Sequence, residues 1–170
     1  MAEHTIFKTL RFKRLGTPSC GFEGLDDFLR EKNIPFYGST GNLKPKGPLT
    51  SKGETSLVVT TVAELGLNNV CCYADILKAA ERTGLKPCRP AVGPQLLFDY
   101  PDQPDGEFLI IATQPEDMGW RTGDTLWATY ALGKAAINFN PVHQYLEAQL
   151  MHPPEETGNY AEVYWVFELK

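Results

Sequence analysis

Two segments of this chain are apolar at both odd and even positions, and that pattern restricts the possible folds more than any other feature. They are Glu107–Thr113, EFLIIAT, and Ala161–Leu169, AEVYWVFEL. Successive side chains of a β-strand point to opposite faces, so a strand that is apolar at both parities needs cover on both sides. We therefore expect the first segment to be a central strand. We expect the second to be central too, or else to take part in association.

The first of these strands is expected to form a hairpin with Gln95–Tyr100, across the loop Pro101–Gly106. A two-residue turn at the Asp-Gly pair would put two prolines of this loop inside the ladder, where they cannot donate hydrogen bonds. A six-residue loop avoids this and sets the register. On one face of the hairpin we then expect Leu96, Phe98, Leu109 and Ile111, and on the other Leu97, Phe108 and Ile110.

Shorter patterns predict two helices and the remaining strands. Apolar residues at three- and four-residue spacing predict helices at 22–32 and 70–83. Residues 86–94 are expected to be extended, and residues 142–151 fit either a strand or a short helix. Alternating and β-branched residues predict further strands at 4–13, 56–65, 125–132 and 134–139.

Together these elements predict a single α+β domain over residues 1–170. Its mostly antiparallel or mixed sheet would have six or seven strands, with the two helices packed on one face. An apolar content of 42% and a charged content of 22% are ordinary for one globular domain. Residues 37–55, rich in glycine, proline and lysine, are expected to form a mobile surface loop.

Charge is distributed unevenly along the chain. Residues 1–52 hold nine Lys and Arg against five Asp and Glu, a net charge of +4, whereas residues 53–170 hold seven against sixteen, a net charge of −9. The acidic part would repel a phosphate backbone, which argues against nucleic-acid binding. No apolar run is long enough for a membrane helix and no apolar signal core follows the N-terminus, so we expect a cytoplasmic protein without a membrane partner.

The four cysteines are expected to be reduced thiols. Cys71 and Cys72 are adjacent and no CxxC pair is present, so neither a disulfide framework nor a zinc site is predicted. Both are expected in the first turn of the second helix, where the helix dipole favours a thiolate, and a redox role stays open. Cys88 beside Arg89 is either a nucleophile or a small buried residue, the interpretation that we prefer.

Carboxylates gather around the hairpin loop, at Asp99, Asp102, Asp105 and Glu107. Such a cluster can bind a divalent cation, but the order DxDxDG of a calcium loop is absent, and turn formation accounts for the acids. His143 and Glu147 would share one face of a helix, yet HxxxE alone is no metal motif. We therefore expect no metal and no cofactor. Gln103 is required by neither turn nor strands, so Gln103 and Asp102 are the first candidates for binding in this loop.

Three motifs run through the chain: TTVAELGL before the second helix, GLKPCRPAVGPQLLFDYPDQPDGEFLIIATQP after it, and YWVFELK at the end. Together they resemble a family of uncharacterised bacterial proteins of similar length, whose core reads VGP-x-L-x-x-x-Y-x-DQP-x-GE-x-L-x-IA. A Cys-Pro pair precedes that core in the family, and Arg89 interrupts it here. The resemblance covers nearly the whole chain and implies a bacterial origin and a single domain. Because the family carries no assigned activity, it implies no catalytic residues.

Two functions follow as hypotheses. Plentiful late aromatic residues, Trp165 among them, and the missing catalytic constellation favour a non-enzymatic module that binds a protein partner or a second copy of itself. The alternative is a hydrolase-type enzyme with its site near the loop 101–107. The residues of that site would be Asp102, Gln103 and Glu107 with Cys88 or His143. A deep pocket lined by them would favour the enzyme, and an exposed patch of Trp and Tyr the binding module.

Overall fold

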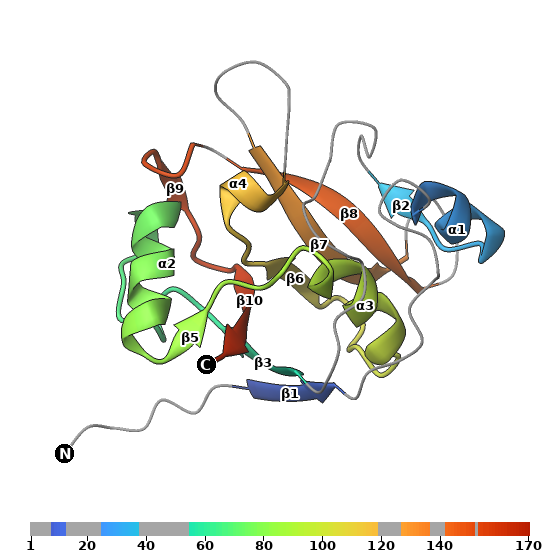
Figure 1. The fold of residues 1–170 in the computed structure, drawn as a ribbon, viewed down its shortest axis with the longest axis horizontal. Coiled ribbons are helices and arrows are strands. Elements are labelled where there is room, and N and C mark those ends of the chain that lie inside the picture. Colours follow the sequence, from blue (N-terminus) through green and yellow to red (C-terminus); the bar gives the residue numbers. More distant parts are fainter. Residues whose placement is uncertain (1–7, 13–24, 38–54, 119–126, 137–141, 152) are drawn as a thin grey trace.

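A computed structural model describes residues 8–12, 25–37, 55–118, 127–136, 142–151 and 153–170 (Figure 1). The mobile loop predicted at 37–55 falls, apart from its two end residues, outside the described residues. Cys20 and Trp120 also lie outside them.

One mixed sheet forms the centre of the structure. In spatial order its strands are β1 (Lys8–Phe12), β3 (Thr55–Thr60), β10 (Tyr164–Leu169), β6 (Phe108–Ile111), β7 (Trp127–Ala135), β8 (His143–Met151) and β2 (Phe36–Tyr37), and β5 (Leu85–Lys86) also pairs with β10. The pairs β10–β6 and β2–β8 are parallel, and the other neighbours are antiparallel. Of the described strands of this sheet, six exceed two residues. The predicted α+β domain with a mixed sheet is therefore confirmed.

The strand β10 is central, as its two-sided apolar pattern predicts. It lies between β3 and β6, and its side chains divide between two separate core clusters. Trp165 and Phe167 belong to one cluster and Val166 to the other, and all three are fully buried. The neighbouring strand β6 divides in the same way. Since successive side chains point to opposite faces, the two clusters lie on opposite faces of the sheet.

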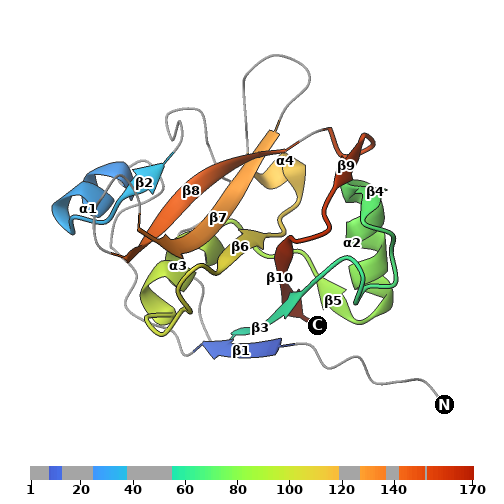
Figure 2. The same cartoon turned by 180° about the vertical axis from the view of Figure 1, so that it is seen from behind.

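Helices cover both faces of the sheet, so the expectation that they share one face is wrong. The helix α2 (Tyr73–Arg82) contributes Tyr73, Ile76, Ala79 and Ala80 to the cluster of Trp165. The helices α1 (Leu25–Glu31) and α3 (Val92–Asp99) contribute to the cluster of Val166. Figures 1 and 2 show α2 and α1 at opposite ends of the molecule, with the short α4 (Pro115–Met118) between them. None of the described helices has the length and apolar character needed to cross a membrane.

The predicted hairpin is wrong, because its first arm is the helix α3 rather than a strand. Leu96 and Leu97 both face the same core cluster, which adjacent residues of a strand cannot do and adjacent residues of a helix can. Pro94 lies in the first turn of α3, where a helix tolerates proline because no hydrogen-bond donor is needed there. The strand β6 pairs with β7 and β10 instead. The loop Pro101–Gly106 thus joins a helix to a strand.

The two strands predicted on either side of Gly133 form one continuous strand, β7, in which Gly133 pairs with Tyr145 of β8. A Cβ atom at Gly133 would lie 2.2 Å from Cζ of Tyr145. The glycine is therefore needed because the Tyr145 ring lies against it, and not because the chain turns at this position. Residues 142–151, which fit either a strand or a helix, contain the strand β8. His143 and Glu147 therefore lie on a strand and not on a helix.

Two of the predicted boundaries also differ. The strand predicted at 56–65 ends at Thr60, where the Glu64 carboxylate accepts hydrogen bonds from the backbone N–H of Thr61 (2.7 Å) and from the hydroxyl of Thr60 (3.1 Å) and so closes a turn. The helix predicted from residue 70 begins at Tyr73. Before it, β4 (Val70–Cys72) pairs with β9 (Thr157–Asn159) in a separate two-stranded sheet. The prediction that Cys71 and Cys72 lie in the first turn of a helix is therefore wrong.

Gly93 sets how closely α3 approaches the sheet, and its replacement by alanine is expected to destabilise the fold. The added Cβ would lie 2.5 Å from Cβ of Tyr130, an atom next to the buried backbone of β7 that cannot move aside. We expect Gly93→Ala to lower the free energy of unfolding by roughly 1–3 kcal/mol, measured by urea denaturation. Gly133→Ala meets only the outer end of the half-buried Tyr145 ring and should cost less. An equal or larger loss for Gly133→Ala would contradict this account.

Candidate anion-binding site

Gln103, the unexplained residue of the loop, holds the loop to the sheet. Its side chain is 1% exposed. The amide Nε2 donates hydrogen bonds to the carbonyl oxygens of Glu107 (3.2 Å) and Leu132 (3.3 Å), and Oε1 accepts one from Nε2 of Gln144 (3.1 Å). Every polar atom of the Gln103 side chain is thus engaged within the protein. Its presence is explained by the packing of the loop on β7 and β8, with no ligand required.

The charged residues of the loop lie in different environments. Asp102 is exposed, and Asp105 pairs with Nζ of Lys134 at 3.2 Å. The same Nζ donates a hydrogen bond to the carbonyl oxygen of Gln103 (2.8 Å), so Lys134 reinforces the anchoring of the loop. Glu107 is half-buried at the start of β6. Asp102, Gln103 and Glu107 thus differ in burial, since the first is exposed, the second buried and the third half-buried.

Cys88, the proposed partner of the loop residues, lies at the other end of β6. Its backbone N–H donates to the carbonyl oxygen of Ala112 (2.6 Å), whereas Gln103 contacts Glu107. Glu107 and Ala112 are five residues apart, about 16 Å in a strand. His143 neighbours Gln144 on β8, and adjacent residues of a strand face opposite sides, so its side chain points away from Gln103. The residues of the proposed hydrolase site are therefore dispersed.

The thiol of Cys88 is held in its neutral form. Burial raises its pKa well above the usual range, and the neighbouring carboxylate of Glu168 raises it further, while Arg89 and Lys86 offset part of the effect. The Sγ atom donates a hydrogen bond to the carbonyl oxygen of Val166 (3.3 Å). A nucleophilic cysteine needs an accessible thiolate. The thiol of Cys88 is neither accessible to solvent nor charged, which agrees with the prediction that Cys88 is a small buried residue.

Trp165, the other candidate for binding, lies inside the protein. Its ring is fully buried and packs against Tyr73 (centroids 5.3 Å apart) and edge-on against Tyr160 (5.5 Å). Of the late aromatic residues whose side chains the structure describes, Tyr164 is exposed, whereas Tyr130, Tyr160 and Phe167 are buried. The buried residues of this group therefore belong to the core and offer no surface to a partner.

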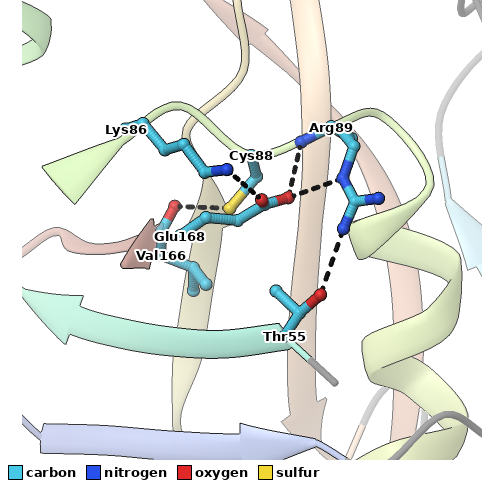
Figure 3. Close-up of polar contacts among 6 residues, drawn as sticks. All are labelled: Thr55, Lys86, Cys88, Arg89, Val166 and Glu168. Carbon is cyan, nitrogen blue, oxygen red and sulfur yellow. Dashed lines mark hydrogen bonds and ion pairs between the residues drawn. The ribbon is translucent and has the colours of Figure 1, made fainter. Parts of the chain in front are cut away.

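Sequence reasoning missed Glu168, the charged residue with the most unusual position. It is 3% exposed, yet it lies near the end of the central strand β10. Oε1 accepts hydrogen bonds from the backbone N–H (3.1 Å) and from Nε (3.0 Å) of Arg89. Oε2 lies 3.4 Å from Nζ of Lys86, and Nη2 of Arg89 donates to Oγ1 of Thr55 (3.1 Å) (Figure 3). A buried carboxylate requires such partners, because removal of an unpaired charge from water costs several kcal/mol.

The strands bring these groups together from distant parts of the chain. In the antiparallel pair β5–β10, Lys86 lies directly opposite Glu168. Arg89 follows three residues later, in the connection that leads from β5 to α3, and Thr55 begins β3 on the other side of β10. Figure 3 shows the side chain of Lys86, from the end of β5, and that of Arg89, from the connection, converging on Glu168. The carboxylate thus fixes the position of two cations at the surface.

Above Glu168 the surface forms an open polar hollow of about 430 Å³, which we call the cationic hollow. Its lining includes Thr55, Ser56, Lys86, Arg89, Glu168 and Lys170. Three of these side chains are cationic and one is anionic, so the lining carries a net charge of +2 in a chain whose net charge is −5. A hollow lined mainly by charges of one sign concentrates ions of the opposite sign. The arrangement is therefore suited to an anionic group.

The sequence contained one signal for this site. Glu168 interrupts the apolar run AEVYWVFEL at the same parity as Val166, so it occupies a position where a side chain faces the core. A carboxylate in such a position predicts a basic partner. The identity of that partner was not predictable, because Lys86 and Arg89 are about 80 residues away along the chain.

Comparison with protein-family models, with curated proteins and with solved structures gave no match. In the described part of the chain, no three side chains among His, Cys, Asp and Glu are grouped as metal ligands would be. The chemistry of the cationic hollow is thus the main indication of function.

Cys88 is expected to resist alkylation in the folded protein. Its thiol is buried and neutral, whereas Cys72 lies partly exposed on β4. After treatment with iodoacetamide at pH 8, mass spectrometry of tryptic peptides should find Cys72 modified and Cys88 modified only after addition of urea. Alkylation of Cys88 at the rate of Cys72 in the native protein would show that the thiol is accessible.

Asp99, at the end of α3, is expected to reduce stability at neutral pH. Burial raises its pKa, and its buried Oδ1 accepts no hydrogen bond from the described residues. Because the folded state holds the proton more tightly than the unfolded state, wild-type stability gains from this group as the pH falls through the raised pKa. We expect Asp99→Asn to raise the melting temperature at pH 7, with the advantage shrinking towards pH 3. A difference that is constant between these pH values would contradict the prediction.

Proposed function

We propose that the protein is a non-enzymatic binding module that receives a carboxylate of a protein partner in the cationic hollow. The observation that carries this proposal is the convergence of Lys86 and Arg89 on one buried carboxylate, beside Lys170, which also lines the hollow and whose Nζ lies 3.6 Å from Glu81. Glu168 holds the guanidinium of Arg89 through Nε and the backbone N–H, and Thr55 holds Nη2. A cation that is already fixed loses little further conformational freedom when it binds a ligand.

The charge distribution supports a local anionic group rather than a long polyanion. Residues 53–170 carry a net charge of −9, which would repel a nucleic-acid backbone over its length. A single carboxylate on a protein surface interacts mainly with the cations nearest to it, since salt screens charges beyond about 8–10 Å. The excess positive charge of the hollow therefore favours a carboxylate of a protein partner.

The groups in the hollow favour binding over catalysis. None of the described residues that line it is a histidine or a cysteine, and the carboxylate of Glu168 already contacts two cations. General acid–base catalysis needs a group that can exchange a proton with the substrate. The cations of the lining can hold an anion through charge and hydrogen bonds.

We also place this activity in the bacterial cytoplasm. The motif string VGPQLLFDYPDQPDGE supports the bacterial origin through its resemblance to bacterial proteins. Cys71, Cys72 and Cys88 are free thiols, which fits a reducing compartment.

Binding of fluorescein-labelled hexaglutamate, measured by fluorescence anisotropy, tests the proposal. We expect saturable binding to the wild-type protein that weakens as salt is added. Lys170→Glu should weaken binding roughly 3- to 10-fold, because it reverses one charge of the lining without removing a contact to Glu168.

Lys32→Glu is the matched control, because it changes the net charge equally at an exposed residue that directly follows α1, and α1 and β5 lie at opposite ends of the molecule (Figure 1). It should leave the affinity within about twofold of the wild type, because none of the described residues that line the hollow lies on or next to α1. An equal loss of affinity in both variants, or no binding of hexaglutamate by the wild type, would contradict the proposal.

A further inference from the structure

A second hollow of about 320 Å³ adjoins the cationic hollow, and its walls are mostly apolar. We call it the apolar hollow. Its apolar lining comes from Ala74 and Leu77 of α2, Leu85 of β5, and Pro87. The two hollows are contiguous, because Lys86 and Lys170 line both of them.

The two shared lysines place their ammonium groups differently. Nζ of Lys170 lies 3.6 Å from Glu81, which lines the apolar hollow, so only Lys86 gives the boundary between the hollows a direction. A lysine side chain combines an apolar stem with a charged end. Nζ of Lys86 lies 3.4 Å from Glu168, which lines the cationic hollow alone, whereas the residue also borders Leu85 and Pro87 in the apolar hollow. The ammonium group of Lys86 thus lies in the cationic hollow, and its apolar stem forms part of the wall between the cationic and the apolar hollow.

On the basis of the function proposed above, we infer that the partner presents an extended peptide segment carrying an acidic and an apolar side chain two residues apart. The acidic side chain would enter the cationic hollow and the apolar one the apolar hollow. In an extended chain, side chains at positions i and i+2 point the same way and lie about 7 Å apart. Because the two hollows share Lys86 and Lys170 as lining residues, we assign to them the nearest pair of side chains that face the same way in an extended chain.

Both hollows are open to solvent, which favours a peptide over a small amphiphile. A free fatty acid or similar ligand needs a cavity that encloses most of its surface. Two neighbouring open hollows of opposite character instead suit successive side chains of a bound peptide, as in other modes of peptide recognition. Charge complementarity fixes the acidic side chain in one hollow, and apolar contact fixes its neighbour in the other.

Three labelled peptides test the inference: one with the sequence Gly-Ser-Glu-Ser-Leu-Ser-Gly, one with Ser in place of Leu, and one with Glu and Leu adjacent. The first should bind the wild-type protein roughly tenfold more tightly than the second, because it buries one more apolar side chain. It should also bind more tightly than the third. Equal affinity for the first and third peptides would overturn the spacing of the two side chains.

Leu77→Gln makes the apolar hollow polar while the residues of the cationic hollow stay in place. It should abolish the advantage of the leucine peptide and keep the wild-type affinity for hexaglutamate, which has no leucine to place in the apolar hollow. If the advantage persists in Leu77→Gln, the apolar hollow is not the binding site of the leucine. If hexaglutamate binds but leucine adds nothing, this inference fails and the carboxylate site stands. If hexaglutamate itself does not bind, the proposed function fails.

Discussion

Burial of β10 on both of its faces is the constraint on which the rest of the structure depends. Trp165 and Phe167 fill the core beneath α2, while Val166 fills the core beneath α3. Each face exposes large apolar side chains that only a packed layer can remove from water, at roughly 25 cal/mol for each Å² buried. The sheet therefore needs helices on both faces. The neighbours β3 and β6 divide their side chains between the same two clusters.

The same strand also creates the candidate site at the point where it leaves the core. Glu168 occupies a core-facing position two residues after Val166, where water no longer solvates its carboxylate. The cost of that burial is offset by Arg89 and Lys86, which the pairing of β5 with β10 places within reach. Two cations are thus fixed at the surface because a single anion is fixed beneath them. Fold and site share one cause, the position of β10 in the sheet.

Sequence patterns predicted those features that depend on side-chain parity alone. The two-sided apolar runs predicted central strands at 107–113 and 161–169, and β6 and β10 lie within them. The same reasoning failed for Gln95–Tyr100, because a short apolar run fits a buried helix as well as a buried strand. Gly93 and Pro94 carried the missing information: one lets α3 approach Tyr130, and the other lies in its first turn.

The candidate site could not be predicted from the alternation of side chains along a single strand, since it depends on a pairing between strands far apart in the sequence. Gln103 is a second residue whose long-range contacts the sequence pattern does not predict. Its three hydrogen bonds reach Glu107, Leu132 and Gln144, and two of these lie on strands that no local pattern connects to the loop. Gln103, which neither the turn nor the adjacent strands require, therefore indicated a long-range contact within the fold, and not a ligand.

The central place of β10 has a consequence for the order in which the protein can fold during synthesis. Its neighbours β3 and β6 are complete long before residues 164–169 are made, yet they can become neighbours only through β10. Until then each has an unpaired edge on the side that β10 will occupy, and such edges promote aggregation. The growing chain must carry two incomplete half-sheets, and a single late strand joins them into one cooperative unit.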